Sequence, residues 1–235
     1  MSYSIIKTLH IVLLAAWLGM EITVFILFSR HRDFEGISVE GRRALAEVHE
    51  LIAFGPRIFW MPMFVLGLLL VTLGDWAFEG AGGVVLVAVV TGLAVIWLMS
   101  QTYVFFARRS VSRLASQPRH LAWIRRVGVF DTCSRVVVVV ALSGTGVLSI
   151  LGFGPIDHWW LAWKVILFSA LVGVTMIWKQ VGRRVAVERR FVVGIDTDRM
   201  PDLVLFRKLT YQAQALLVSF WALMLAIIWL AIDKP

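Results

Sequence analysis

The stretch from Ser4 to Ser29 reads SIIKTLHIVLLAAWLGMEITVFILFS, and it decides the fold class of this chain. A helix that crosses the hydrocarbon core of a bilayer, which is about 30 Å thick, needs about 20 predominantly apolar residues. This stretch exceeds that length, although it includes Lys7, His10 and Glu21. It lacks a small-residue cleavage site, and its arginines follow the apolar run instead of preceding it. We therefore expect a retained transmembrane span and not a signal peptide.

Five further apolar stretches reach or approach the same length. They are Ile58–Leu73, Gly83–Phe106, Val136–Leu151, Trp159–Trp178 and Thr210–Ile232. The second and fourth of the six spans are short, and we expect them to extend past Arg57 and Arg135, whose long side chains can reach the interface. Hydrophobic residues make up 60% of the chain and charged residues only 16%, which is unlike a soluble domain. The sequence therefore predicts an all-α, polytopic membrane helix bundle with six transmembrane helices.

The basic residues predict how the chain is oriented. Of 23 Lys and Arg, 20 fall in three alternate connections, namely Arg30–Arg57, Arg108–Arg135 and Lys179–Lys208. The connections around Asp75–Glu79 and Gly154–His158 carry acidic residues and no Lys or Arg. Cytoplasmic loops are enriched in Lys and Arg, so we expect the basic connections inside and both termini outside. The net charge of +8 then reflects topology and contact with anionic lipid, and not nucleic-acid binding.

The first basic connection contains an amphipathic pattern from about Ser38 to Phe54. Apolar residues recur there at helical spacing, opposite acidic and basic residues. We expect a cytoplasmic helix that lies on the inner membrane face or covers the bundle, with Gly55 and Pro56 turning the chain into the second span. No hydrophilic stretch is long enough for a separate soluble domain, so residues 1–235 are expected to form a single membrane domain.

Three ionisable residues inside the predicted spans are the candidates for chemistry: His10, Glu21 and Lys164. Ionisable groups at membrane depth usually face the bundle interior, a cavity or a ligand, because exposing them to lipid is costly. His10, Trp17 and Glu21 return to one helical face, with His10 and Glu21 roughly 16 Å apart. Lys164 lies at a similar depth to His10 in another span that starts outside. We therefore expect His10 and Lys164 to face one cavity, lined by Trp17.

Each of these candidates has a structural alternative. His10 either hydrogen-bonds to a neighbouring helix or ligates a haem or metal, and Lys164 either snorkels to the outer interface or joins the site. Glu21 is too deep for its short side chain to reach water easily, so we expect it to be protonated, paired or part of a polar path. His49 is expected to be solvated or interfacial, and the single Cys133 to serve in packing.

The methionines inside the predicted spans suggest a second kind of site. Thioethers bind copper, and the candidates are Met20, Met61, Met63 and Met99. Packing is favoured for them, because the chain has no Met-x-x-Met motif and no His-Met cluster. The chain also lacks a phosphate loop, HExxH, CxxC and a nucleophile elbow. The paired intramembrane histidines of di-haem b-type cytochromes are missing, so at most one histidine-ligated haem fits.

Two segments resemble a group of small bacterial membrane proteins. Ile6-Lys7-Thr8-Leu9-His10-Ile11, with the following Trp17-Leu18-Gly19, resembles the first helix of HemJ-type protoporphyrinogen oxidases, CopD-type copper-resistance proteins and related families. WLAWKVIL, from Trp160 to Leu167, resembles the lysine-containing helix of the same group. A helix ending in a Thr-Gly pair precedes that helix in the group, as Thr145-Gly146 does here.

The resemblance implies a cofactor and a location. In HemJ-type proteins the first-helix histidine and the later lysine are linked to haem b binding, which implies His10 as axial ligand to the haem iron. Lys164 would lie near a propionate or at the second axial position, with Trp17 lining the site. Glu21 would help a proton move between the site and the cytoplasm. The group implies a multi-pass protein of the bacterial inner (plasma) membrane that exchanges electrons with a quinone or a tetrapyrrole, which would make it a membrane oxidoreductase.

The chain departs from the HemJ-type pattern in three respects. The arginine after the first-helix glycine and the histidine late in the lysine helix have no clear counterparts, and six spans exceed the usual four. The resemblance therefore implies the superfamily and a haem, and not the specific oxidase activity. Two other functions stay open, which are a CopD-like copper or small-solute permease and a non-catalytic membrane anchor for a partner subunit.

Overall fold

The computed structural model of the protein describes residues 3–32, 36–74, 76–77, 80–109, 118–194 and 200–232. Within these residues the chain forms seven helices, and one isolated bridge pairs Ala77 with Ile156. The helices are α1 (Tyr3–Arg32), α2 (Val39–Ile52), α3 (Phe54–Leu73), α4 (Gly80–Arg109), α6 (Pro118–Ile150), α7 (Trp159–Val192) and α8 (Leu203–Ile232).

Six helical segments are long and apolar enough to cross a membrane: α1, α2 together with α3, α4, α6, α7 and α8. The all-α class and the six predicted spans are therefore confirmed. Several helices are longer than their apolar runs. For example, α6 begins at Pro118 where the apolar run begins at Val136, and α7 ends at Val192 where the run ends at Trp178. The helical hydrogen bonding continues into the charged segments because Arg, Lys and Glu are good helix formers.

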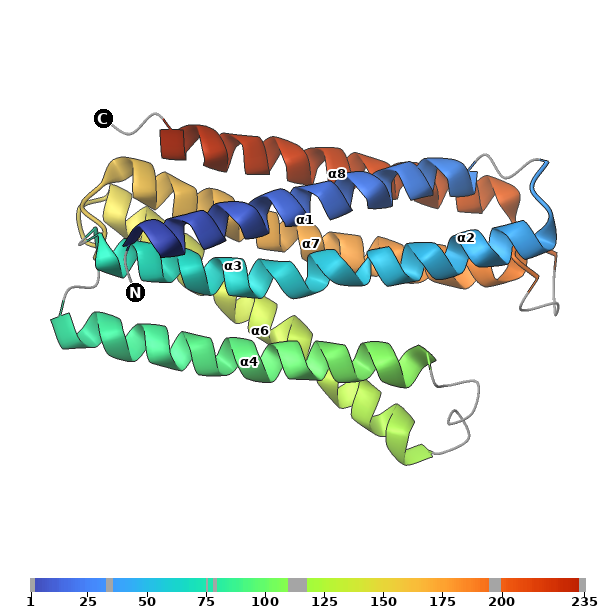
Figure 1. Ribbon diagram of the computed structural model, residues 1–235, viewed down its shortest axis with the longest axis horizontal. Helices are drawn as coiled ribbons and strands as arrows, with labels where there is room; N and C mark the ends of the chain where they lie inside the picture. Colours follow the sequence, from blue (N-terminus) through green and yellow to red (C-terminus); the bar gives the residue numbers. More distant parts are fainter. Residues whose placement is uncertain are drawn as a thin grey trace.

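The two ends of the bundle differ in which chain termini and charged residues lie there. Figure 1 shows α1 beginning and α8 ending at the same end, as an even number of spans requires. We call this the terminal end, and the opposite end, where α7 ends and α8 begins, the basic end. At the terminal end Asp157 is exposed, whereas the predicted acidic residues Asp75 and Glu79 lie outside the described residues. The assignment of the terminal end to the outside stays a prediction from the charge distribution.

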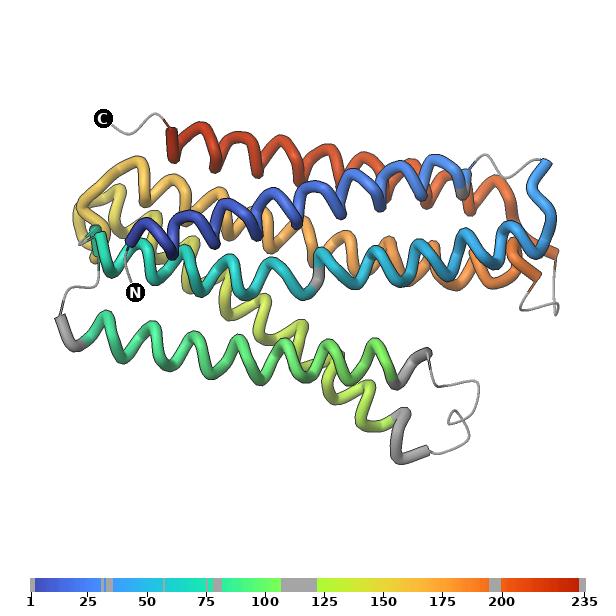
Figure 2. The backbone as a smooth tube through the Cα atoms, viewed as in Figure 1, coloured from blue at the N-terminus to red at the C-terminus, as the bar shows by residue number. Residues whose placement is uncertain are grey.

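The amphipathic helix α2 continues almost in line with α3 (Figure 2). The interruption between them falls at Ala53, while Gly55 and Pro56 belong to the first turn of α3 and make no sharp turn. A Cβ on Gly55 would lie 2.0 Å from Sδ of Met20, so the glycine allows α3 to approach α1 closely. The predicted helix is thus present, but it prolongs the bundle instead of turning away from the second span.

Polar contacts fasten α2 to the basic end of α7. An ion pair of 2.6 Å joins Arg189 to Glu50. Arg43 donates hydrogen bonds to the backbone carbonyl oxygens of Val193, at 3.1 Å, and Gly194, at 2.7 Å. Gly194 has a φ of +66°, a left-handed conformation that glycine adopts readily. These contacts satisfy carbonyl groups that the end of a helix leaves without intrahelical partners.

The six spans pack unevenly against one another. α7 packs extensively along both α6 and α8, and α1 packs along α3. α4 packs mainly on α3 and touches α6 at few positions, because α6 runs obliquely to the other helices (Figure 1). Large apolar side chains such as Val84, Val140 and Trp229 are exposed on the outward faces of the spans. A surface of this kind is expected where the surrounding solvent is lipid.

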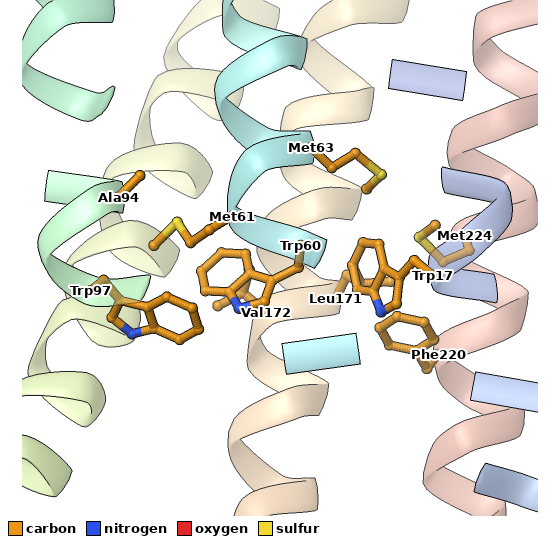
Figure 3. Close-up of a cluster of buried hydrophobic side chains, with 10 residues drawn as sticks. All are labelled: Trp17, Trp60, Met61, Met63, Ala94, Trp97, Leu171, Val172, Phe220 and Met224. Carbon is orange, nitrogen blue, oxygen red and sulfur yellow. The ribbon is translucent and has the colours of Figure 1, made fainter. Parts of the chain in front are cut away.

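The central core lies where α1, α3, α4, α7 and α8 meet. Figure 3 shows its members: Trp17, Trp60, Met61, Met63, Ala94, Trp97, Leu171, Val172, Phe220 and Met224. The ring of Trp17 packs edge-on against Phe220, with 5.2 Å between centroids, and Trp60 packs similarly against Trp97 at 5.1 Å. Edge-to-face aromatic pairs of this kind add to the free energy of burial. Five of the six spans therefore contribute buried side chains to this core.

Candidate functional site

The predicted site lies in the half of the bundle nearer the terminal end, around His10. The imidazole packs against Gly67 of α3, where a Cβ would lie 3.4 Å from Cε1 and 4.0 Å from Nδ1. The Met63 backbone is within hydrogen-bonding reach of the ring. Nδ1 is buried and has no hydrogen-bond partner within the described residues. The ring is thus held between α1 and α3 with one nitrogen left uncommitted.

Lys164 is an electrostatic neighbour of His10, as their equal depth predicts. Its ammonium lies 5.7 Å from the centroid of the Trp160 ring, a cation–π geometry. Trp160 packs edge-on against Trp76, with 5.3 Å between centroids, and Trp76 packs against Tyr3 at 6.2 Å. We call Trp160, Trp76 and Tyr3 the aromatic cap. These rings lie near the ends of α1, α3 and α7 at the terminal end, and Trp160 contacts the ammonium of Lys164.

Trp17 and Glu21 form a second polar contact, deeper along α1. The indole Nε1 of Trp17 donates a hydrogen bond of 3.3 Å to Oε1 of Glu21, one turn further along the helix. Trp17 is 2% exposed and packs in the same cluster as Met63, whose backbone contacts His10. Glu21 is half-buried. The structure therefore places Trp17 between the histidine and the carboxylate, with its donor directed toward the carboxylate.

A buried ionic network, which the sequence reasoning missed, lies toward the basic end. Asp131 of α6 is 3% exposed, and its two carboxylate oxygens have different partners. Oδ2 pairs with Nζ of Lys179 on α7 at 2.5 Å, and Oδ1 pairs with Nε of Arg135 at 3.1 Å. Trp97 of α4 donates a hydrogen bond of 2.8 Å to Oδ1. One carboxylate thus holds two cations and an indole from three helices.

The guanidinium of Arg135 is surrounded by further partners. It lies 5.2 Å from the Trp60 ring centroid and 5.6 Å from that of Trp97, between indoles of α3 and α4. It also donates a hydrogen bond of 2.7 Å to Oγ1 of Thr175 on α7. Arginine suits such a position because its planar, weakly hydrated group combines stacking with hydrogen bonding. The ionic network of Asp131, Arg135 and Lys179 therefore joins four of the six spans.

The sequence does contain a signal for this network. Asp131 and Arg135 stand four residues apart at the start of an apolar run, the spacing at which opposite charges meet on one helical face. We counted Arg135 and Lys179 only as basic residues near the membrane surface. Their pairing needed the crossing of α6 and α7, which no single-chain periodicity reveals. The network lies about 28 Å along α6 from its end at the terminal end of the bundle.

Three other expectations are resolved. His49, expected to be solvated or interfacial, is 5% exposed, with 4.4 Å between its ring centroid and that of Phe28, because α2 packs inward on α1. Cys133, expected to serve in packing, is exposed. Met61 and Met63 point to opposite sides of α3 (Figure 3), as residues two apart on a helix must. These two thioethers therefore do not converge on one metal position.

Among the described residues, no group of three or more His, Cys, Asp or Glu side chains is placed to bind a metal ion. Comparisons of the chain with models of protein families, with curated proteins and with solved structures found no match.

Proposed function

We propose that this protein binds haem b in the half of the bundle nearer the terminal end, and that it has a redox role in the bacterial inner membrane. One observation carries the proposal: the buried Nδ1 of His10 has no hydrogen-bond partner in the described part of the chain, although Lys164 lies nearby. A buried polar atom normally finds a partner, because leaving it unsatisfied costs free energy. An axial bond to iron would satisfy the nitrogen.

The residues around His10 fit a haem in their chemistry. Imidazole is the commonest protein ligand to haem iron. Because residue 67 is glycine, no side chain fills the space beside the edge of the His10 ring. Lys164 would supply a positive charge for a propionate as the ammonium, or a second nitrogen ligand to the iron as the neutral amine. The aromatic cap and Trp17 add apolar surface, which a macrocycle needs in order to leave lipid for protein.

Haem supplies one-electron redox chemistry when it is bound, and the chain supplies ligand, charge and a dry pocket. His10 would bind the haem iron and orient the macrocycle, and Lys164 would balance the charge of a propionate. The aromatic cap would keep water out of the site from the terminal end. Glu21 holds a proton at its carboxyl group and passes it toward the cytoplasm, while Trp17 fixes that group by its hydrogen bond. The electron partner in this proposal is a membrane-soluble quinone or a tetrapyrrole substrate.

An absorption spectrum tests this proposal directly. Protein purified from cells with adequate haem should show a Soret band that shifts on reduction, because the ligand field of the iron changes with redox state. His10→Ala should strip or loosen the haem by removing its axial bond. His49→Ala is the control, since that histidine packs on Phe28 where α2 meets α1, far from His10 along the bundle, and should leave the haem in place.

Substitution of Lys164 distinguishes two roles that this lysine could have. Lys164→Ala should lower haem content partly if the ammonium only pairs with a propionate, and as far as His10→Ala if it is an axial ligand. Glu21→Gln should spare haem content and slow proton-coupled turnover. Colourless wild-type protein that also fails to take up added haemin would overturn the proposal, and the permease and anchor functions would then be tested in its place.

A further inference from the structure

A groove runs between α6 and α7 at the basic end of the bundle, far from His10. Its volume is about 470 Å³. The lining is of two kinds: the cationic side chains Arg125 and Arg183 with the hydroxyl of Thr132, and the apolar side chains Ile124 and Val129. Both arginines are exposed, and neither forms an ion pair with a described residue. The groove is therefore positively charged and partly apolar.

The ionic network adds to this charge from behind the groove. Nζ of Lys179 donates a hydrogen bond of 3.0 Å to Oγ1 of Thr132 and one of 3.4 Å to the carbonyl oxygen of Gly128, and both residues line the groove. Asp131 already divides its carboxylate between Lys179 and Arg135. In and behind the groove, the four cationic side chains Arg125, Arg183, Lys179 and Arg135 are thus accompanied by a single carboxylate, that of Asp131. The excess positive charge favours an anionic ligand.

The depth of the groove identifies the source of that anion. Arg183 lies 24 residues beyond Trp159, which is about 36 Å along α7. The hydrocarbon core is about 30 Å thick, and the headgroup regions extend it to about 40–45 Å. The two arginines are therefore at the level of lipid phosphates, in the leaflet at the basic end. Val129, which lies about 6 Å deeper along α6 than Arg125, lines the same groove with surface that suits an acyl chain and not a free inorganic anion.

We propose that this groove is a specific site for an anionic phospholipid of the leaflet at the basic end. The guanidinium groups of Arg125 and Arg183 bind the phosphate, and the acyl chain lies against Val129. Guanidinium groups bind phosphate through paired, charge-assisted hydrogen bonds. Basic pockets between transmembrane helices on the cytoplasmic side are known to bind lipid headgroups. The site goes beyond the proposed haem function and does not depend on it.

Native mass spectrometry of the delipidated full-length protein tests the site. The protein is titrated separately with phosphatidylglycerol and with phosphatidylcholine, and the bound lipids are counted. We expect one phosphatidylglycerol to bind more tightly than any phosphatidylcholine. The double variant R125Q/R183Q should weaken this binding by about tenfold or more, since two phosphate contacts are lost.

A second double variant provides the matched control. Arg126 and Arg184 are exposed and adjacent to the two groove arginines, but they do not line the groove. R126Q/R184Q removes the same charge and should change the affinity for phosphatidylglycerol by less than about twofold if the site is specific. An equal loss of affinity in both double variants would show diffuse attraction to a basic surface, and it would overturn the proposal.

Cys133 reports whether the lipid occupies this groove. It is the only cysteine of the chain, it is exposed and it lines the groove. Bound phosphatidylglycerol should slow the alkylation of Cys133 by maleimide in wild type and not in R125Q/R183Q. Phosphatidylcholine and inorganic phosphate should have little effect. Protection by inorganic phosphate equal to that by phosphatidylglycerol would assign the groove to a soluble anion and end the lipid proposal. This outcome is independent of whether the absorption spectrum of the protein shows haem.

Discussion

The indole Nε1 of Trp97 donates a hydrogen bond of 2.8 Å to Oδ1 of Asp131, and this bond connects α4 with α6. The two helices otherwise touch at few positions. Both side chains are almost fully buried, Trp97 at 1% and Asp131 at 3% exposure. A hydrogen bond to a charged acceptor away from water is stronger than a neutral one. The bond therefore contributes a large share of the interaction that positions α4 against α6.

Replacing Trp97 with Phe should destabilise the protein by about 1.5–3 kcal/mol, the usual contribution of a hydrogen bond to a charged group. The aromatic ring that stacks on Arg135 is kept, so the loss reports mainly on the bond. Thermal unfolding of the purified protein in detergent, monitored by near-ultraviolet circular dichroism, measures the change. Because the bond connects α4 with α6, protease cleavage between these helices should also become faster.

Trp60→Phe is the matched control for Trp97→Phe. Trp60 also stacks on Arg135, at 5.2 Å, but its buried Nε1 has no hydrogen-bond partner among the described residues. The substitution removes an unsatisfied polar group together with some apolar area, so it should cost about 1 kcal/mol or less. A loss of stability at Trp60 equal to that at Trp97 would show that ring size matters, and not the bond to Asp131.

Asp131→Asn should destabilise the protein by about 3 kcal/mol. The change removes the negative charge that both Arg135 and Lys179 require, and cations left buried without a partner are costly. The midpoint of thermal unfolding should fall accordingly. Adding Lys179→Met to Asp131→Asn should recover part of the loss, because it removes one of the two uncompensated cations.

Asp157→Asn serves as the control for the charge change, since Asp157 is exposed in the connection between α6 and α7. It should leave the unfolding midpoint unchanged. If Asp131→Asn also left the midpoint unchanged, the ionic network would contribute nothing measurable to stability.

The fold was predictable because a bilayer imposes strict rules on the chain. Every span must satisfy its backbone hydrogen bonds internally, so six long apolar runs imply six helices. Depth along a helix is also predictable, since each residue adds about 1.5 Å. That rule places Lys164 at a depth similar to that of His10, although their spans are far apart in the sequence. Helix ends were less predictable, because helical hydrogen bonding in α6 and α7 continues past the apolar runs.

The ionic network and the burial of His49 were not predictable, for a common reason. Both depend on how helices cross, and crossing angles depend on contacts between distant segments. The sequence places Asp131 and Arg135 on one helical face, but it does not say that Lys179 and Trp97 come to meet them. Likewise, the amphipathic pattern of α2 does not reveal that His49 packs on Phe28. Side-chain partners between helices require the three-dimensional arrangement.

Reporter fusions test the orientation, which follows from the basic connections. Fusions after Gly80 and at the C-terminus should report a location outside the cytoplasm. A fusion after Gln117 should report the cytoplasm, because 20 of 23 Lys and Arg fall in alternate connections. Alkaline phosphatase is active outside and green fluorescent protein is fluorescent inside, so paired fusions give opposite signals at each position. A cytoplasmic C-terminus together with an outside N-terminus would contradict an even number of spans.

Gly146 and Gly144 of α6 lie close together in sequence but differ in what a side chain would meet. A Cβ on Gly146 would lie 2.9 Å from the carbonyl oxygen of Ala162 and 2.5 Å from Cγ1 of Ile166, whereas a Cβ on Gly144 meets nothing within 4 Å. The backbone of Ala162 is fixed within α7, so Gly146→Ala should push α6 and α7 apart. Overpacking of this kind costs about 1–3 kcal/mol.

Gly144→Ala should be neutral or should stabilise the protein by up to about 1 kcal/mol, because alanine is the better helix former. Unfolding in increasing concentrations of a denaturing detergent, monitored by circular dichroism, compares the stability of the two variants. Since α7 carries Lys164 one turn or less from the contact, Gly146→Ala should also lower haem content if haem binds there, and Gly144→Ala should not. Equal stability of the two variants would show that the close approach of α6 and α7 at Gly146 does not exist in the membrane protein.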